Sequence, residues 1–212
     1  MLPLLHLTYT SWLPMLLVHN TQNTSFLAAN GQILAMRRAT RDTLGGFEGV
    51  QNEVVDDMAL CRLAKQQGLR VAFADGHRIA TCRMYTSFGE IWEGFSKNLY
   101  EGLGERPLLL LGVIGVYSLA FIAPYLALFA GLMGVEDALV PGLIGVGANL
   151  ALRGLLTARW GHRIVSVLLH PVAVCVLIGI AVNSWRWSRR GAIHWRGRTY
   201  ASRSARTSAK GS

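Results

Sequence analysis

The chain has 212 residues, of which 51% are hydrophobic and only 16% are charged, and its formal net charge is +9. Soluble proteins carry about 25% charged residues, so this composition excludes an ordinary soluble domain and indicates an integral membrane protein. The first 107 residues balance ten basic against ten acidic side chains, whereas the last 29 carry eight basic and no acidic ones. A basic run beside apolar segments is typical of a membrane surface rather than of nucleic-acid binding.

Residues 1–27 form an apolar lead-in that ends in a polar loop. The apolar part has no basic start and no Ala-x-Ala site, so it is not typical of a signal peptide. It is also shorter than the ~20 residues that a spanning helix needs, and it contains Pro3 and Pro14. We therefore expect an interfacial or buried helix.

Residues 28–107 predict a compact α/β unit. Short apolar runs bounded by turn residues predict strands over residues 32–36 and 71–74. Apolar residues near helical spacing predict helices over 39–44 and 52–67, each ended by glycine.

An amphipathic helix is predicted over residues 88–99, directly before the apolar region, and we expect it to lie in the membrane interface. Residues 108–187 then predict membrane helices, and residues 188–212 predict a basic tail that is disordered from about 201. The expected spans are about 108–133, 139–158 and 164–185.

The sidedness of these segments leaves two alternatives. The loop with Glu136 and Asp137 is acidic and the loop from Arg159 to Arg163 is basic, as expected for an outside loop followed by an inside loop. A third full span would place the basic tail outside. Either His170-Pro171 breaks the last segment into a re-entrant pair, or the charge rule fails. We expect an inner-membrane protein whose catalytic part faces the cytoplasm.

The most informative motif is the acidic pair Asp56-Asp57, which opens the helical pattern at 52–67. Carboxylates at a helix start gain from the dipole, so at least one can stay ionised and take a proton from a hydroxyl. The structural alternative is that the pair caps the helix.

Several motifs in order resemble a known family. They are Ala28-Ala29-Asn30-Gly31-Gln32, Arg37-Arg38, Leu44-Gly45-Gly46-Phe47, Val55-Asp56-Asp57-Met58-Ala59-Leu60-Cys61-Arg62, Arg83-Met84-Tyr85, Trp92-Glu93-Gly94-Phe95-Ser96-Lys97-Asn98 and Trp195-Arg196-Gly197-Arg198-Thr199-Tyr200. Together they resemble the membrane-bound family 2 glycosyltransferases, in the branch of carotenoid, hopanoid and ceramide sugar transferases. The resemblance implies a partial α/β GT-A-like domain, its acceptor half, followed by transmembrane helices.

The resemblance also implies roles for individual residues. Asp57 corresponds to the general base that deprotonates the acceptor, and Asp56 replaces the usual glutamate of the family's acidic pair. Asn30, Gly31 and Gln32 would line the sugar site, although Asn-Gly is also a common turn pair.

Arg83 would contact the donor diphosphate, and Trp92 would pack beside the acceptor. A membrane-interface anchor is an equally good interpretation of Trp92. In the tail, Arg196 and Arg198 could bind a diphosphate, or they could bind anionic lipid headgroups.

The activity that the resemblance implies is inverting transfer of a sugar from a nucleotide-sugar to a lipid or polyprenyl-type acceptor. The family uses Mg or Mn bound by an Asp-x-Asp motif, and no such motif occurs in this sequence. We therefore expect the C-terminal part of a longer enzyme, inactive without its donor-binding half. The alternative is a non-catalytic membrane subunit or anchor that retains glycosyltransferase motifs.

Overall fold

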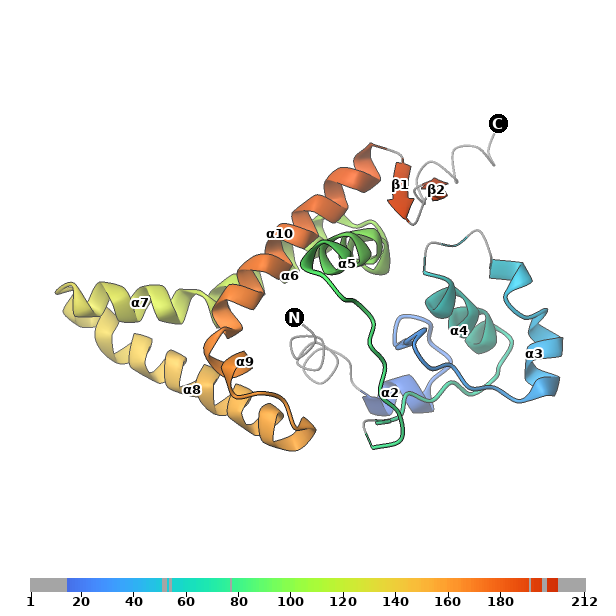
Figure 1. Ribbon diagram of the computed structural model, residues 1–212, viewed down its shortest axis with the longest axis horizontal. Helices are drawn as coiled ribbons and strands as arrows, with labels where there is room; N and C mark the ends of the chain where they lie inside the picture. Colours follow the sequence, from blue (N-terminus) through green and yellow to red (C-terminus); the bar gives the residue numbers. More distant parts are fainter. Residues whose placement is uncertain are drawn as a thin grey trace.

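The computed structural model describes residues 15–50, 53, 55–76, 78–190, 192–195 and 198–201. The described chain consists of a small helical part and a set of long apolar helices (Figure 1). The small part contains α2 (Met15–Asn20), α3 (Arg38–Leu44), the 3-10 helix η1 (Glu48–Val50) and α4 (Asp56–Gln66). The remaining elements are α5 (Phe88–Gly102), α6 (Pro107–Phe121), α7 (Ala123–Leu132), α8 (Glu136–Trp160), α9 (Val165–Leu168), α10 (His170–Arg189), and the strands β1 (Ala192–Trp195) and β2 (Arg198–Ala201).

The predicted α/β GT-A-like domain is wrong. Neither residues 32–36 nor residues 71–74 form a strand, and the described residues pair as a sheet only in the antiparallel hairpin of β1 and β2. Leu34 and Val71, which made these segments resemble strands, pack as irregular chain against the apolar face of α4. Their hydrophobicity reflects packing against a helix and not strand pairing.

The core of the small part lies between α3, η1 and α4. Leu44, Val50, Leu60 and Ala64 are buried together there. The helix predicted at 39–44 is confirmed as α3, and Gly45 ends it in the left-handed conformation with φ of 71°. That conformation strains side chains with a Cβ, so glycine suits this position.

The predicted amphipathic helix is α5, and it begins with a side-chain cap. Ser87 Oγ accepts the N–H of Glu90 at 3.2 Å, while the Glu90 carboxylate accepts the N–H of Thr86 at 2.8 Å. This reciprocal arrangement closely resembles a capping box. The body of α5 packs along α10, with Gly94, Ser96 and Tyr100 buried.

Polar contacts fasten α5 to α10. Asn183 Nδ2 donates to Ser96 Oγ at 2.9 Å, and the Tyr100 N–H donates to Ser184 Oγ at 2.9 Å. One turn earlier on α10, Gly179 leaves room for the ring of Trp92, since a Cβ there would come within 3.0 Å of that ring. The helix is therefore held by another helix as well as by its position next to the apolar region.

Three helical segments are long and apolar enough to cross a membrane: Pro107–Leu132, Glu136–Trp160 and His170–Arg189. The first contains a break at Ile122, between α6 and α7, where Pro124 lacks the N–H that the carbonyl of Ala120 would otherwise bind. Asn149 Nδ2 of α8 donates to that carbonyl at 3.0 Å. A polar side chain within the apolar helices thus compensates for the proline.

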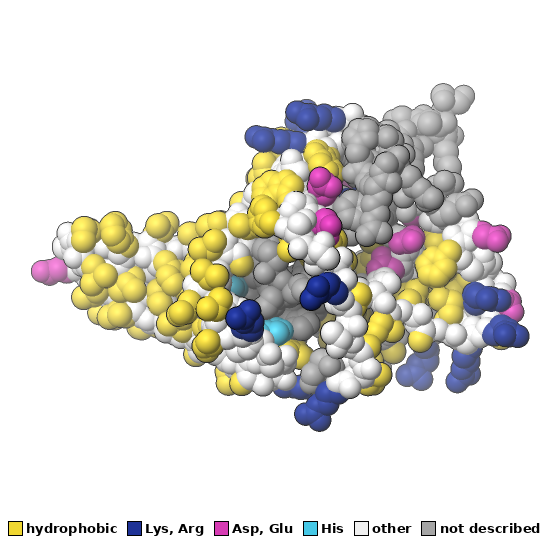
Figure 2. Space-filling view, in the orientation of Figure 1, with side chains coloured by type: hydrophobic (Ala, Val, Ile, Leu, Met, Phe, Trp, Pro, Cys, Tyr) yellow, Lys and Arg dark blue, Asp and Glu magenta, His cyan; other side chains and the backbone are white. Residues whose placement is uncertain are grey.

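The helices α7 and α8 form an antiparallel pair with very close backbones (Figure 1). A Cβ added at Gly142 would collide with the backbone of Leu128, and one added at Gly131 would lie 2.5 Å from Leu139 Cα. Small residues commonly allow such approaches between membrane helices. The surface of this pair is almost wholly apolar (Figure 2).

Candidate functional site

The acidic pair lies in the first turn of α4, as the sequence predicts. Asp56 Oδ1 accepts the N–H of Asp57 at 3.0 Å, and Asp57 Oδ1 accepts the N–H of Met58 at 2.8 Å. First-turn N–H groups have no partner inside their helix, so these contacts stabilise the start of α4. The N-cap position of α4 is Val55, which makes no side-chain cap hydrogen bond, so these contacts are not an N-cap.

Asp57 also binds the loop that carries the predicted sugar contacts. Its Oδ2 accepts the N–H of Gly31 at 2.5 Å, across 26 residues of sequence. A Cβ at Gly31 would lie 3.2 Å from the same oxygen, so glycine permits this approach. Asn30 Oδ1 accepts the N–H of Gln32 at 3.2 Å and shapes the turn. The structure therefore brings the predicted base together with the loop 30–32.

A second contact links this loop to the segment before α5. Gln32 Nε2 donates to Met84 Sδ at 2.8 Å. The exposed Arg83 directly precedes Met84 in the sequence. Tyr85 lies against Gly94 of α5, and its ring meets that of Phe95 edge-on at 5.7 Å. Residues 83–85 thus connect the loop 30–32 to the helix beside the membrane.

Trp92 lies elsewhere. Its ring packs against Gly179 of α10 and lies 6.1 Å from the ring of Phe88. These contacts belong to the seam between α5 and α10. Arg196 lies outside the described residues, and Arg198 is described only as part of the backbone of β2.

The local charge acts on one neighbour of Asp57. Burial raises the pKa of the Cys61 thiol, and the negative charge of Asp57, one turn earlier on α4, raises it further. The thiol is therefore protonated at neutral pH. Cys61 is buried beside Leu27 and Ala29, directly before the loop 30–32.

Lys65 is a residue of this region that the sequence analysis missed. Its side chain is 2% exposed, and Nζ donates to the carbonyls of Val18, Thr21 and Phe26 at 2.8, 2.9 and 2.7 Å. Its position in the helix could have indicated that Lys65 is buried, because it lies on the same face of α4 as the buried residues Leu60, Cys61 and Ala64. It joins the lead-in to the helix that carries the acidic pair.

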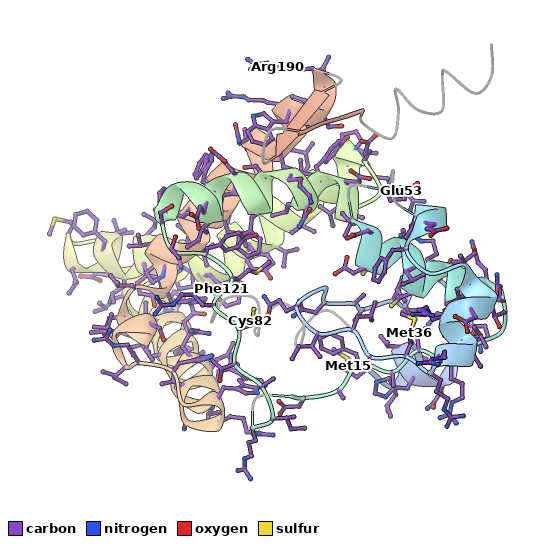
Figure 3. The ribbon with its side chains drawn as sticks, turned by 45° about the vertical axis from the view of Figure 1, so that its right-hand side comes forward. Met15, Met36, Glu53, Cys82, Phe121 and Arg190 are labelled. Atoms are coloured by element: carbon purple, nitrogen blue, oxygen red, sulfur yellow. The ribbon has the colours of Figure 1, made fainter. Side chains whose placement is uncertain are left out.

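A groove also lies beside α4, between the loop before that helix and the C-terminal end of α5. The residues that line it are Glu53, Val55, Met58, Ala59, Arg62, Glu101 and Gly102. Figure 3 labels Glu53 at this place. Neither Asp56 nor Asp57 lines the groove, so it is separate from the contacts of the acidic pair.

The fold and these contacts define a membrane protein whose small helical part presents an acidic helix start to a glycine loop. Residues 5–207 match glycosyl transferase family 21, and the chain belongs to this family. No curated protein and no solved structure matches the chain. The family implies a glycosyl transfer reaction with a nucleotide-sugar donor and an acceptor.

A divalent metal is part of the activity expected from the sequence. Within the described ranges, no three side chains among His, Cys, Asp and Glu gather to hold a metal ion. The carboxylates of the acidic pair instead accept N–H groups of the backbone. The described residues therefore do not fit a metal site.

Proposed function

We propose that this chain supplies the acceptor side of an inverting glycosyltransferase that transfers a sugar from a nucleotide-sugar to a lipid. The observation that carries the proposal is the contact between Asp57 and the loop 30–32 in a chain of glycosyl transferase family 21. The apolar helices beside this part make a membrane lipid the natural acceptor.

In the proposed reaction, the Asp57 carboxylate takes the proton of an acceptor hydroxyl. Its two oxygens accept one N–H each, and a carboxylate oxygen has a second lone pair available for that proton. The hydroxyl oxygen then forms a bond to the anomeric carbon while the bond to the nucleoside diphosphate breaks. Because this is a single displacement, the configuration inverts.

Within this proposal, Asn30 and Gln32 bind sugar hydroxyls and Arg83 binds the departing diphosphate. Arg83 is exposed and can therefore reach an anion. The metal-binding groups for the donor come from protein outside the described residues, because neither an Asp-x-Asp motif nor a described ligand cluster provides them.

The test measures transfer from labelled nucleotide-sugars to extractable lipid in membranes that contain the chain, with and without added donor-binding protein of the family. We expect transfer only with the addition, and we expect Asp57→Asn to abolish it. The control is Asp42→Asn, because Asp42 is an exposed carboxylate on α3 that pairs with its neighbour Arg41. Turnover by the chain alone would refute the requirement for additional protein, and full turnover by Asp57→Asn would refute the role of Asp57.

A non-catalytic membrane subunit is the second candidate. The observation that favours it is that both oxygens of Asp57 bind backbone N–H groups, which is sufficient for a structural role. In that case Asp57→Asn lowers the thermal stability of the chain, and any reaction of its partner falls only in proportion to the folded fraction. A catalytic role predicts loss of turnover in protein that remains folded.

A further inference from the structure

The helices α6 and α10 are antiparallel neighbours over most of their length. Val174 of α10 packs with Tyr117 and Phe121 of α6, and seven residues later Ala181 packs with Leu110, which lies seven residues before Tyr117. Beyond them, Ser188 Oγ donates to Glu105 at 3.0 Å, two residues before α6 begins at Pro107. The C-terminal end of α10 therefore lies level with the N-terminal end of α6.

The α6–α7 segment and α8 are each long enough to cross a bilayer. With a rise of about 1.5 Å per residue, the 26 residues of Pro107–Leu132 and the 25 of Glu136–Trp160 reach beyond the ~30 Å of hydrocarbon. Two crossings return the chain to the face where it entered. In agreement, Arg159 near the end of α8 forms an ion pair of 3.1 Å with Asp75, in the irregular segment after α4 whose Val71 packs on the small helical part.

The contacts of α10 with α6 give its direction, although its 20 residues are also long and apolar enough to cross a membrane. The 15 residues of α6 span only about 22 Å of the ~30 Å of hydrocarbon, and α10 begins beside the far end of α6. The first residue of α10, His170, contacts the ring of Phe121 at 5.0 Å, at the end of α6 that lies inside the apolar region. Figure 3 labels Phe121 and, at the other end of α10, Arg190.

We propose that this chain crosses the bilayer twice and that α9 and α10 form a re-entrant segment, which enters from the face of Trp160 and returns to it. The small helical part, the end of α8 and the end of α10 then contact one leaflet. The partner of that surface is a leaflet with anionic headgroups.

The distribution of charge supports this arrangement. The connection between α7 and α8 and the first turn of α8 contain Glu136 and Asp137 and no basic residue, and they lie at the free end of the α7–α8 pair (Figure 2). Six basic residues flank the ends of the apolar helices at the opposite face: Arg106, Arg159, Arg163, Arg186, Arg189 and Arg190. A seventh, Arg153, is buried within α8, seven residues before Trp160. Basic residues favour the cytoplasmic face, where anionic lipids also attract them. A third crossing would separate Arg186, Arg189 and Arg190 from the other three flanking residues.

The test is labelling of single cysteines in sealed vesicles of both orientations with a membrane-impermeant maleimide. Cys61, Cys82 and Cys175 are replaced by serine, and the reporters are Asp42→Cys, Asp137→Cys, Arg163→Cys and Arg190→Cys. We expect the reporters at 42, 163 and 190 to react from one side and the reporter at 137 from the other. Reaction at 190 from the side of 137 would overturn the proposal.

The unsubstituted chain provides a second measurement that needs no variant. Trypsin added to sealed vesicles should cleave after Arg189 or Arg190 in the orientation that also exposes Arg41 of α3, which lies in the small helical part. Cleavage of the two regions from opposite sides would overturn the proposal even if a cysteine variant failed to fold.

Discussion

At the scale of single residues, Lys65 carries more of the structure than its place in the sequence indicates. It binds three backbone carbonyls from a segment 39 to 47 residues earlier, two of them in a polar loop. Carbonyls in loops and at helix ends lack helical partners, and leaving one buried and unsatisfied costs free energy. The same cation could not be replaced by an apolar side chain of similar length without that cost.

We therefore predict that Lys65→Met lowers the free energy of unfolding by about 1–3 kcal/mol or more, the cost of leaving a buried polar group unsatisfied. Gln66→Ala, at the exposed neighbouring position of α4, serves as the control and should change it little. Thermal unfolding in detergent, followed by circular dichroism, measures both. Equal stability of the two variants would show that the three contacts contribute nothing.

A second prediction concerns Cys61 and Cys82 (Figure 3 labels Cys82). Cys82 is exposed and Cys61 is buried, so N-ethylmaleimide should modify Cys82 before Cys61 in the folded chain. Burial and then the charge of Asp57 raise the pKa of Cys61, so removing that charge should lower this pKa and increase the thiolate at a given pH. Asp57→Asn should shift the rate profile of Cys61 to lower pH, whereas Asp56→Asn should leave it in place.

The shape of the profile separates charge from exposure. A change of pKa moves the midpoint of the rate against pH, whereas loosening of the loop 30–32 raises the rate at every pH. An unmoved midpoint in Asp57→Asn would contradict the electrostatic coupling.

At the scale of elements, the break between α6 and α7 depends on a residue in a third helix. Pro124 leaves the carbonyl of Ala120 without its helical donor, and Asn149 supplies the missing hydrogen bond. We predict that Asn149→Leu costs about 0.6 kcal/mol, the average for hydrogen bonds within membranes, and at most about 1.7 kcal/mol. In Pro124→Ala the backbone N–H returns, so adding Asn149→Leu to that variant should cost less. Additive costs in a double-mutant cycle of unfolding would contradict the compensation.

The close pairing of α7 and α8 gives a further prediction with a control in the same helix. A Cβ at Gly142 would meet the backbone of Leu128, whereas one at Gly147 would meet nothing within 4 Å. Overpacking of this kind costs about 1–3 kcal/mol, so Gly142→Ala should destabilise the chain while Gly147→Ala should not. A melting temperature of Gly142→Ala equal to that of Gly147→Ala would show that the two backbones separate freely.

At the scale of the whole molecule, two contacts hold the rest of the chain to the apolar helices. The segment after α4 is joined to α8 by an ion pair, and α5 packs along α10. The ion pair of Asp75 with Arg159 joins side chains that are 43% and 56% exposed, and such pairs contribute about 0–1 kcal/mol. The seam between α5 and α10 is longer and includes the fit of Trp92 at Gly179.

We expect Gly179→Val to destabilise the chain more than Asp75→Asn, because valine would displace the ring of Trp92 whereas the asparagine removes only a solvated pair. Limited proteolysis of the connection between residues 78 and 87 measures the release of α5. Faster cleavage in Asp75→Asn than in Gly179→Val would reverse this order of the two contacts.

The sequence predicted those features that have a local signature. Apolar periodicity and terminal glycines placed α3, α4 and α5 within a few residues, and continuous apolar runs placed the candidate spans. The α/β interpretation failed because Leu34 and Val71 share the hydrophobicity of strand residues while packing on α4. A local sequence pattern does not distinguish an apolar side chain in a strand from one in irregular chain that packs on a helix.

In the candidate site, too, local features were predictable from the sequence and long-range contacts were not. The position of Asp57 at a helix start was predictable, whereas its contact with Gly31 and the contact of Gln32 with Met84 join residues 26 and 52 positions apart. Hydrogen bonds between residues so far apart in the chain produce no periodic pattern in the sequence. Only the family resemblance placed Asn30, Gly31 and Gln32 in the same site as Asp57.

The contacts of Lys65 also have a consequence in time. Its three acceptors leave the ribosome 39 to 47 residues before Lys65 itself. At a synthesis rate of roughly 5–20 residues per second, the lead-in waits about 2–9 s for its cation. During that interval Leu27, which packs beside Cys61 of α4 in the folded chain, has no helix to pack against, and a membrane surface offers an apolar side chain an alternative. Early association with the bilayer would then precede the folding of the part that carries Asp57.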